Sequence, residues 1–175
     1  MRLEMVIREG GPEDAPLIAN VQIKSWRYAY KGIIDQNYLD ECLDRDVRMK
    51  VWQDTLTRKA EGMFLAFEAT VLAGFAFVGK SRNERYQGYA ELYAIYLDPD
   101  FMRQGVGKGL FQQVSAYVVR RGFRKMFVKV LTDNKVGRDF YERMGGIVVS
   151  ESEDGRVFGG KFYPEIRYVW GGLGF

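Results

Sequence analysis

A turn within the segment Ile95–Leu110, IYLDPDFMRQGVGKGL, constrains the fold more than any other feature of the sequence. An apolar strand pattern ends at Asp98 and Pro99, because proline cannot donate a ladder hydrogen bond and fixes the local backbone. Gly105 and Gly107 follow, and a helix pattern begins at once. The first turn of a helix leaves backbone amides unpaired and carries partial positive charge. The segment therefore favours binding of a pyrophosphate at the helix start.

Two well-known phosphate loops do not fit this turn, although Arg103 and Lys108 would add full positive charges to it. A Walker loop ending at Lys108 requires glycine where Met102 stands and serine or threonine where Gly109 stands. A dinucleotide fingerprint on the same glycines requires glycine or alanine where Leu110 stands. What remains is a strand, an Asp-Pro dipeptide, the pattern R-Q-G-x-G-K and a helix.

The length and composition predict a single globular domain spanning residues 1–175. A chain of 175 residues can bury one sizeable core, and 47% hydrophobic with 28% charged residues is typical of a folded protein. The formal net charge of +3 is only mildly basic. It permits a small anionic ligand and does not indicate nucleic acid as a partner.

The sequence also bounds the location and the chemistry. The N-terminal MRLEMVIREGG has no apolar core of signal-peptide length, and no run approaches the roughly 20 residues of a membrane span, so we expect a cytoplasmic protein without a membrane partner. Cys42 is the only cysteine and there is no histidine. Ser-His-Asp and Cys-His catalysis and the usual zinc ligands are therefore excluded, and we expect no metal. The chemistry must use Glu, Asp, Lys, Tyr or the backbone.

The order of apolar patterns predicts an α/β fold of the mixed α+β kind. Helix patterns occur at 10–30, 44–60, 106–120 and 135–146, and strand patterns occur at 5–9, 63–69, 71–79, 89–97, 125–131, 146–152 and 165–170. Adjacent strands with short connections favour antiparallel pairing, whereas the strand, helix and strand from 89 to 131 favour a parallel unit. We expect a central, mostly antiparallel twisted sheet of about seven strands with flanking helices.

Three segments together resemble the GNAT family of N-acetyltransferases, which transfer an acetyl group from acetyl-CoA to an amine. They are LYAIYLDPDFMRQGVGKGL, the later TDNKVGRDFYERMGG, which is similar to N-x-x-A-x-x-F-Y-E-x-x-G, and the early W-x-x-A-Y at 26–30. The resemblance covers nearly the whole chain, and the order and spacing of the segments carry it. It implies a GNAT-like sheet whose parallel unit binds CoA.

The resemblance also implies the residues that bind acetyl-CoA. In the family, the strand before the turn separates from its neighbour and pairs with the pantetheine arm, and the turn holds the pyrophosphate. By this resemblance Asn134 touches the pantetheine region, and Tyr141 lies near the sulfur on the same helix face. The other implied cofactor-binding residues are Ile95, Tyr96, Leu97, Arg103, Gln104, Gly105, Val106, Gly107 and Lys108.

Three positions depart from the family pattern. Met102 stands where glutamine or arginine is frequent, and Gly137 stands where alanine is common. Because the turn acts mainly through backbone amides, neither change prevents binding. The family branch that acetylates ribosomal protein N-termini is expected to carry a glutamate where this chain has Lys129. The resemblance therefore speaks against that substrate.

The expected reaction is direct acetyl transfer without a covalent enzyme intermediate. An amine of pKa about 10.4 is protonated at neutral pH, and freeing its lone pair costs roughly 4 to 5 kcal/mol. Glu91 is predicted as the base, through water, because strand alternation is expected to place it on the face of Tyr93, Ile95 and Leu97. A backbone amide near Leu97 would polarise the thioester carbonyl, and Tyr141 would protonate the departing thiolate.

Each of these assignments has an alternative. Glu91 is also consistent with a solvated carboxylate at a strand end, and Tyr141 with a core aromatic. The chain as a whole is also consistent with a catalytically silent, CoA-binding sensor, or with a structural domain whose glycines only allow close helix packing. The first alternative predicts binding without turnover, and the second predicts no CoA binding.

The acceptor is the least constrained part of the function. Trp26, Tyr28 and Tyr30 and the tail GGKFYPEIRYVW at 159–170 are expected to line the acceptor side. Aromatic walls suit polyamines, aminoglycosides, amino acids and peptides alike, so the acceptor stays a small-molecule amine or a protein amino group. Exposed aromatic strand ends leave a homodimer open.

Overall fold

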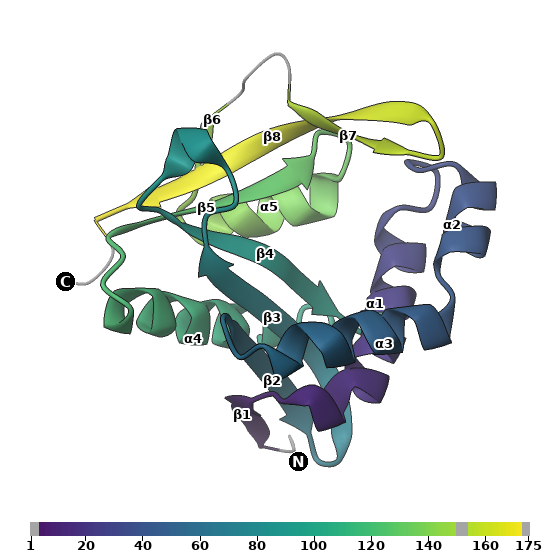
Figure 1. The fold of residues 1–175 in the computed structure, drawn as a ribbon, viewed down its shortest axis with the longest axis horizontal. Coiled ribbons are helices and arrows are strands. Elements are labelled where there is room, and N and C mark those ends of the chain that lie inside the picture. The colour runs from purple at the N-terminus through teal and green to yellow at the C-terminus, as the bar shows by residue number, and fades with distance from the viewer. Residues whose placement is uncertain (1–3, 150–153, 173–175) are drawn as a thin grey trace.

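The computed structural model describes residues 4–149 and 154–172. A twisted sheet of eight strands runs through the molecule in the order β1-β2-β3-β4-β5-β8-β6, and β7 pairs with β8 (Figure 1). Pairing is antiparallel except between β4 and β5. The strands are β1 Met5–Glu9, β2 Gly62–Glu68, β3 Val71–Lys80, β4 Ala90–Leu97, β5 Lys125–Leu131, β6 Ile147–Val149, β7 Gly155–Phe158 and β8 Lys161–Gly171.

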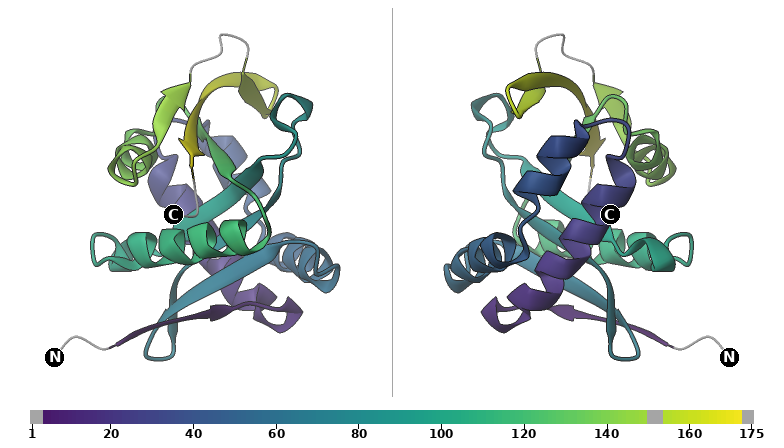
Figure 2. Two further views of the ribbon diagram at one scale, coloured as in Figure 1. Left: turned by 90° about the vertical axis from the view of Figure 1, so that its left-hand side faces the viewer. Right: turned by 90° about the vertical axis from the view of Figure 1, so that its right-hand side faces the viewer.

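Helices cover both faces of the sheet (Figure 2). Their apolar stripes form two cores: α4 and α5 pack on one face, and α1 and α3 on the other. Within α4, Val106, Leu110, Val114 and Val118 recur every four residues and are buried, so they form the apolar stripe of the helix predicted at 106–120. The α-helices are α1 Ala15–Ala29, α2 Gln36–Cys42, α3 Arg45–Thr57, α4 Val106–Arg120 and α5 Lys135–Arg143. None of the helices that the structure describes is long and apolar enough to cross a membrane.

The parallel pair β4–β5 opens the sheet. The two strands are in register at only two positions, Ala90 with Met126 and Glu91 with Phe127. The rest of β4 stays paired with β3 on its other side, so beyond Glu91 it has a free edge facing β5. The mostly antiparallel sheet, the parallel unit and the separation of the two strands are therefore confirmed.

A β-bulge in β4 corrects one prediction. Ala94 pairs with Phe77 and Leu92 pairs with Val78, so Tyr93 is an extra residue in the ladder. The extra residue reverses the alternation, because side chains point to opposite faces every second residue. Ile95 and Leu97 pack on the α4 side, whereas Glu91 lies in register with Gly79 on the face of Tyr96. The prediction that Glu91 shares a face with Ile95 and Leu97 is wrong.

Two elements near the C-terminal strands were not predicted, the strand β7 and the short helix α2. Gly155–Phe158 forms β7, which makes eight strands instead of about seven, and β8 begins at Lys161, before the expected 165–170. The short helix α2 packs against the β7–β8 hairpin, where Tyr163 Oη accepts a hydrogen bond from the Asp35 amide at 3.1 Å. The predicted strand at 146–152 is observed as β6, and its last residues lie outside the described part.

Candidate active site

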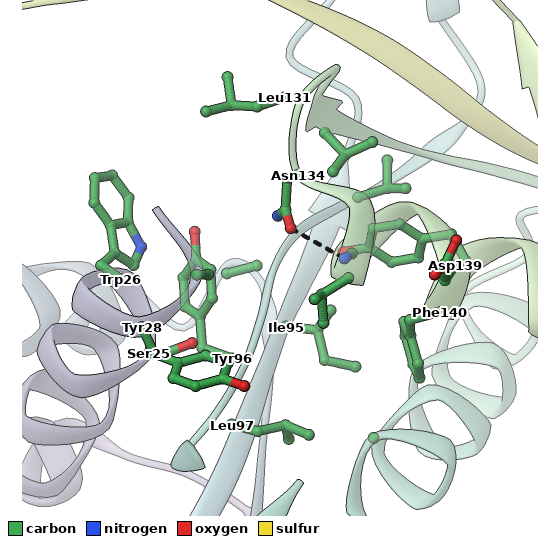
Figure 3. Close-up of a pocket in the computed structure, with 18 of the residues that line it drawn as sticks. Ser25, Trp26, Tyr28, Ile95, Tyr96, Leu97, Leu131, Asn134, Asp139 and Phe140 are labelled. Atoms are coloured by element: carbon green, nitrogen blue, oxygen red, sulfur yellow. Dashed lines mark hydrogen bonds between the residues drawn. The ribbon is translucent and has the colours of Figure 1, made fainter. Parts of the chain in front are cut away.

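A cavity of about 740 Å³ lies where β4 and β5 separate. Its walls come from both faces of the sheet, with α4, α5 and the glycine turn on one side and the end of α1 and the β7–β8 hairpin on the other. Figure 3 shows β4 with Trp26 and Tyr28 to one side and with Asn134 and Phe140 to the other. The opening therefore connects two chemically different halves.

The glycine turn presents unpaired backbone amides to this cavity. Arg103 and Gly105 have φ of 61° and 90°, and Gly105 is the N-cap of α4. Within the part of the chain that the structure describes, no backbone amide from Arg103 to Lys108 donates a hydrogen bond. The next amide, that of Gly109, donates to the Gly105 carbonyl at 3.0 Å. Unpaired amides at a helix start favour an anion.

The two glycines serve different purposes. A Cβ on Gly105 would meet nothing within 4 Å, so glycine is favoured there by its positive φ. A Cβ on Gly107 would lie 3.0 Å from a ring carbon of Phe140, so this glycine allows α4 and α5 to approach closely. Close helix packing was the role that the structural-domain alternative gave to these glycines, and Gly107 has this role beside the open turn.

An aspartate fixes the end of β4 just before the turn. The Asp98 carboxylate accepts hydrogen bonds from the Asp100 amide at 3.1 Å and from Lys24 Nζ at 2.7 Å. This carboxylate is almost fully buried, and its hydrogen bond raises the pKa of Lys24. Because Lys24 belongs to α1, the pair ties the turn on one face of the sheet to the helix on the other.

Helix α5 supplies Asn134 and Tyr141 to the cavity. Asn134 is the N-cap, and its side-chain oxygen accepts a hydrogen bond from the Gly137 amide at 3.1 Å. Tyr141 is 7% exposed and packs against Phe140, Tyr168 and Trp170. Burial first, and then the nearby phenol of Tyr96, raise the pKa of Tyr141. Its hydroxyl therefore keeps its proton at neutral pH.

The other half of the cavity is aromatic. The Trp26 ring contacts Tyr30, Tyr96 and Phe158 edge to face at centroid distances of 5.1, 6.2 and 5.9 Å. These four residues come from α1, β4 and β7 and line the cavity together with Tyr28. Trp26, Tyr28 and Tyr30 line the cavity as expected, whereas Glu165 is the one residue of the tail at 159–170 that does so. Their role toward an acceptor stays a prediction.

Charged residues from the hairpin complete this half, and they were not predicted from the sequence. Glu165 of β8 has a side chain only 6% exposed and forms an ion pair with Arg156 of β7 at 2.9 Å. Burial raises the pKa of Glu165, although Arg156 and Lys129 oppose the shift. The only sequence signal was the position of Glu165 at the start of a predicted strand. Nothing local indicated that β7 would place an arginine beside it.

The chain matches the model of the acetyltransferase (GNAT) family over residues 22–146. That match covers well over half of its length. The chain belongs to this family. It is 37% identical over 132 residues to the uncharacterized N-acetyltransferase YuaI of Bacillus subtilis, a match covering 74% of this chain and 73% of YuaI. As a GNAT protein with such a relative, it is an N-acetyltransferase.

One sequence match and one structure match come from Thermoplasma acidophilum. Spermidine N(1)-acetyltransferase is 26% identical over 160 residues, which cover 89% of this chain and 95% of the relative. The crystal structure of PaiA N-acetyltransferase in complex with coenzyme A superposes with a TM-score of 0.77 at 23% identity and covers 94% of this chain and 98% of PaiA. The second likeness shows that the two proteins share the GNAT fold.

Most of the predicted GNAT site residues line the cavity between β4 and β5. They are Ile95, Tyr96, Leu97, Arg103, Gly105, Gly107, Lys108, Asn134 and Tyr141. Gln104 instead donates from its side chain to the Asp100 carbonyl at 2.9 Å, and Val106 is buried in the core. Glu91 does not line the cavity, and its carboxylate accepts a hydrogen bond from the Arg82 amide at 2.8 Å. Within the described residues, no group of three or more potential ligands could hold a metal ion.

Proposed function

We propose that this GNAT protein transfers the acetyl group of acetyl-CoA to a primary amine of a small molecule or a protein, without a covalent enzyme intermediate. The observation that carries the proposal is the joining of the unpaired amides, the open edge of β4 and an aromatic chamber in one cavity. The two substrates would enter from opposite faces of the sheet and meet at the gap between β4 and β5.

The residues of the first half fit CoA. The amides from Arg103 to Lys108 would bind the pyrophosphate, with the exposed side chains of Arg103 and Lys108 adding charge. The open edge of β4 at Ile95–Leu97 would pair with the amide groups of the pantetheine arm, as a β-strand would. The Asn134 side-chain oxygen already caps α5, which leaves the amide nitrogen of Asn134 to reach the same arm.

Acetyl-CoA supplies an activated acetyl thioester, and the protein positions the amine and moves protons. The amine nitrogen forms a bond to the acetyl carbon, the carbon–sulfur bond breaks, and its electron pair leaves with the sulfur. Tyr141 gives its hydroxyl proton to the sulfur and regains one from the acetylated nitrogen. A backbone amide near Leu97 would stabilise negative charge on the carbonyl oxygen. One further proton must leave the starting ammonium.

Two carboxylates are candidates for the base that takes this last proton. Glu91 stays a prediction: it lies on the face of Tyr96, outside the cavity lining, and a water molecule would have to connect it to the amine. Glu165 lines the cavity. The choice between them does not affect the proposed reaction.

The proposal is tested by thiol release from acetyl-CoA with a panel of amines and peptides that includes spermidine. We expect release that depends on the amine. We expect Tyr141→Phe to lower kcat by about 100-fold, the usual contribution of a general acid, with calorimetric CoA binding retained. Tyr117→Phe, which removes a phenol outside the cavity, is the matched control. CoA binding without release for every acceptor would favour the sensor, and absence of binding would contradict the proposal.

A further inference from the structure

The face of the sheet opposite α4 carries a row of charged side chains. Glu91 lies in register with Phe127 of β5, Lys129 follows two residues later, and on β8 Arg167 and Glu165 lie opposite Lys129 and Leu131. Two carboxylates therefore share the face that α1 covers. Only one of them, Glu165, lines the cavity.

The two carboxylates differ in how they are bound. Glu91 accepts a backbone hydrogen bond from Arg82, which holds its carboxylate toward the β3–β4 loop. For Glu165 the structure records the ion pair with Arg156, and no other described group donates a hydrogen bond to its carboxylate. The cost of burying this charge is offset by the ion pair with Arg156 and by the charges of Lys129 and Arg167, while few donors contact the carboxylate oxygens directly. Glu165 retains capacity to accept a donor from a ligand.

The surroundings of Glu165 suit a cation. Trp26, Tyr30, Tyr96 and Phe158 line the same cavity, and the Trp26 ring contacts the other three. Aromatic rings around a carboxylate attract an ammonium group through the ring quadrupole and the negative charge together. The acceptor of the proposed reaction is an ammonium ion at neutral pH.

We propose that Glu165 binds the ammonium group of the acceptor and takes the proton that frees its lone pair. The inference rests on the proposed function. The ammonium loses one proton to the Glu165 carboxylate, the neutral amine attacks the acetyl carbon, and Tyr141 protonates the leaving sulfur. Glu165 then releases its proton to solvent. Protons and electrons balance without another reactant, and Glu165 takes the role that the sequence predicted for Glu91.

The charges around Glu165 fit this role. Burial raises the pKa of the Glu165 carboxyl above the usual range, and the charge of Asp154 raises this pKa further. The positive charges of Arg156, Lys129 and Arg167 lower the pKa and offset part of the shift. The phenols of Tyr30 and Tyr96 face it from α1 and β4, and the pKa of each is raised by burial. A raised carboxyl pKa brings the base closer to neutral pH, where proton transfer from an amine is more favourable.

The first test compares glutamine variants. With spermidine, or whichever acceptor of the panel turns over fastest, we expect Glu165→Gln to lower kcat/KM by about 100-fold or more at neutral pH. The acidic limb of its pH profile should shift upward toward the pKa of the free amine, about 10.4. Glu165→Asp keeps a carboxylate and should keep that limb with partial activity. Glu4→Gln, far from the cavity, is the matched control. An upward shift of the acidic limb in Glu91→Gln, with the limb unchanged in Glu165→Gln, would overturn the assignment.

A second acceptor separates proton removal from packing. Hydroxylamine is largely unprotonated at neutral pH and needs little help from a base. We expect the loss caused by Glu165→Gln to be much smaller with hydroxylamine than with the alkyl amine. An equal loss with both acceptors, with CoA binding unchanged, would show a structural role and overturn the proposal.

The third test does not depend on turnover, so it distinguishes failure of this inference from failure of the proposed function. In protein labelled with ¹³C at glutamate carboxyls, the signal absent from Glu165→Gln identifies Glu165. We expect it to titrate above the usual range of a glutamate, and its midpoint to fall when propylamine is added, because a bound ammonium favours the carboxylate. A midpoint at or below the usual range, or no response to propylamine, would contradict the proposal.

Discussion

The glycine turn and the β7–β8 hairpin form the two halves of one cavity, yet they are built in different ways. The turn is one continuous stretch in which Asp98, Gly105 and the start of α4 are near neighbours in the sequence. The hairpin half combines Trp26, Lys129, Arg156 and Glu165, which come from four separate elements. Backbone geometry defines the first half, and tertiary packing of side chains defines the second.

This difference suits the two substrates. A turn that binds through backbone amides tolerates changes of side chain, which agrees with Met102 in a position where the family often has glutamine or arginine. The aromatic and charged groups of the hairpin half can change with each acceptor while the sheet is kept. We therefore expect variants of the turn to affect CoA alone, and variants of the hairpin half to affect the acceptor.

The largest effect is expected at Gly105. Gly105→Val places a branched side chain where the pyrophosphate approaches, and we expect CoA binding to weaken by about 100-fold, or roughly 3 kcal/mol. The positive φ of 90° adds a folding cost of about 1 to 2 kcal/mol. Gly122→Val is the matched control, because Gly122 has φ of 84° and nothing within 4 Å, outside the cavity. Calorimetry and thermal unfolding measure both variants.

The two glycine variants should lose similar stability and differ in CoA binding. If both variants weaken CoA binding equally, backbone strain at the ends of α4 lowers the affinity for CoA, and the steric block at the turn does not. That result would remove the distinction between the two halves.

A smaller effect is expected at Tyr28, which lines the acceptor half and is 55% exposed. Tyr28→Ala removes an aromatic wall with little loss of packing, and we expect KM for the acceptor to rise about 5-fold, as for roughly 1 kcal/mol of cation–aromatic contact. The dissociation constant of CoA should not change. Phe162→Ala, at a 54% exposed aromatic outside the cavity, is the control. A Tyr28 variant with weakened CoA binding would break the comparison.

The smallest effect is expected at Lys108, an exposed side chain beside the unpaired amides. Lys108→Ala should weaken CoA binding about 3-fold at low salt, because an exposed charge pair contributes at most about 1 kcal/mol. The difference from wild type should shrink as salt screens the charge. Lys50→Ala on α3 removes an equally exposed lysine outside the cavity. A loss as large as that of Gly105→Val would mean that side chains, not amides, bind the pyrophosphate.

The sequence predicted the turn half well because its signals are local. Asp98 and Pro99 end a strand and the glycine turn begins a helix, and each signal depends on residues within one turn of chain. The order of the patterns and the resemblance together placed Tyr141 in the same cavity. These predictions needed no knowledge of which strands become neighbours, apart from the parallel unit.

The hairpin half could not be predicted in the same way. The predicted face of Glu91 was wrong because an apolar strand pattern does not indicate a bulge such as the extra residue at Tyr93. β7 was missed because GRVF is short and has little strand pattern of its own, and its pairing with β8 brings Arg156 to Glu165. Burial and neighbouring charges give Glu165 its properties, and both follow only from the assembled sheet.

The most direct test of the two-half account is amide hydrogen exchange with and without CoA. The amides from Arg103 to Lys108 have no partner within the described residues, so any hydrogen bond they gain must come from the ligand. We predict that CoA slows exchange across this turn and at Ile95–Leu97, and leaves the hairpin from Gly155 to Glu165 unchanged. No slowing at the turn, or slowing confined to the hairpin, would contradict the account.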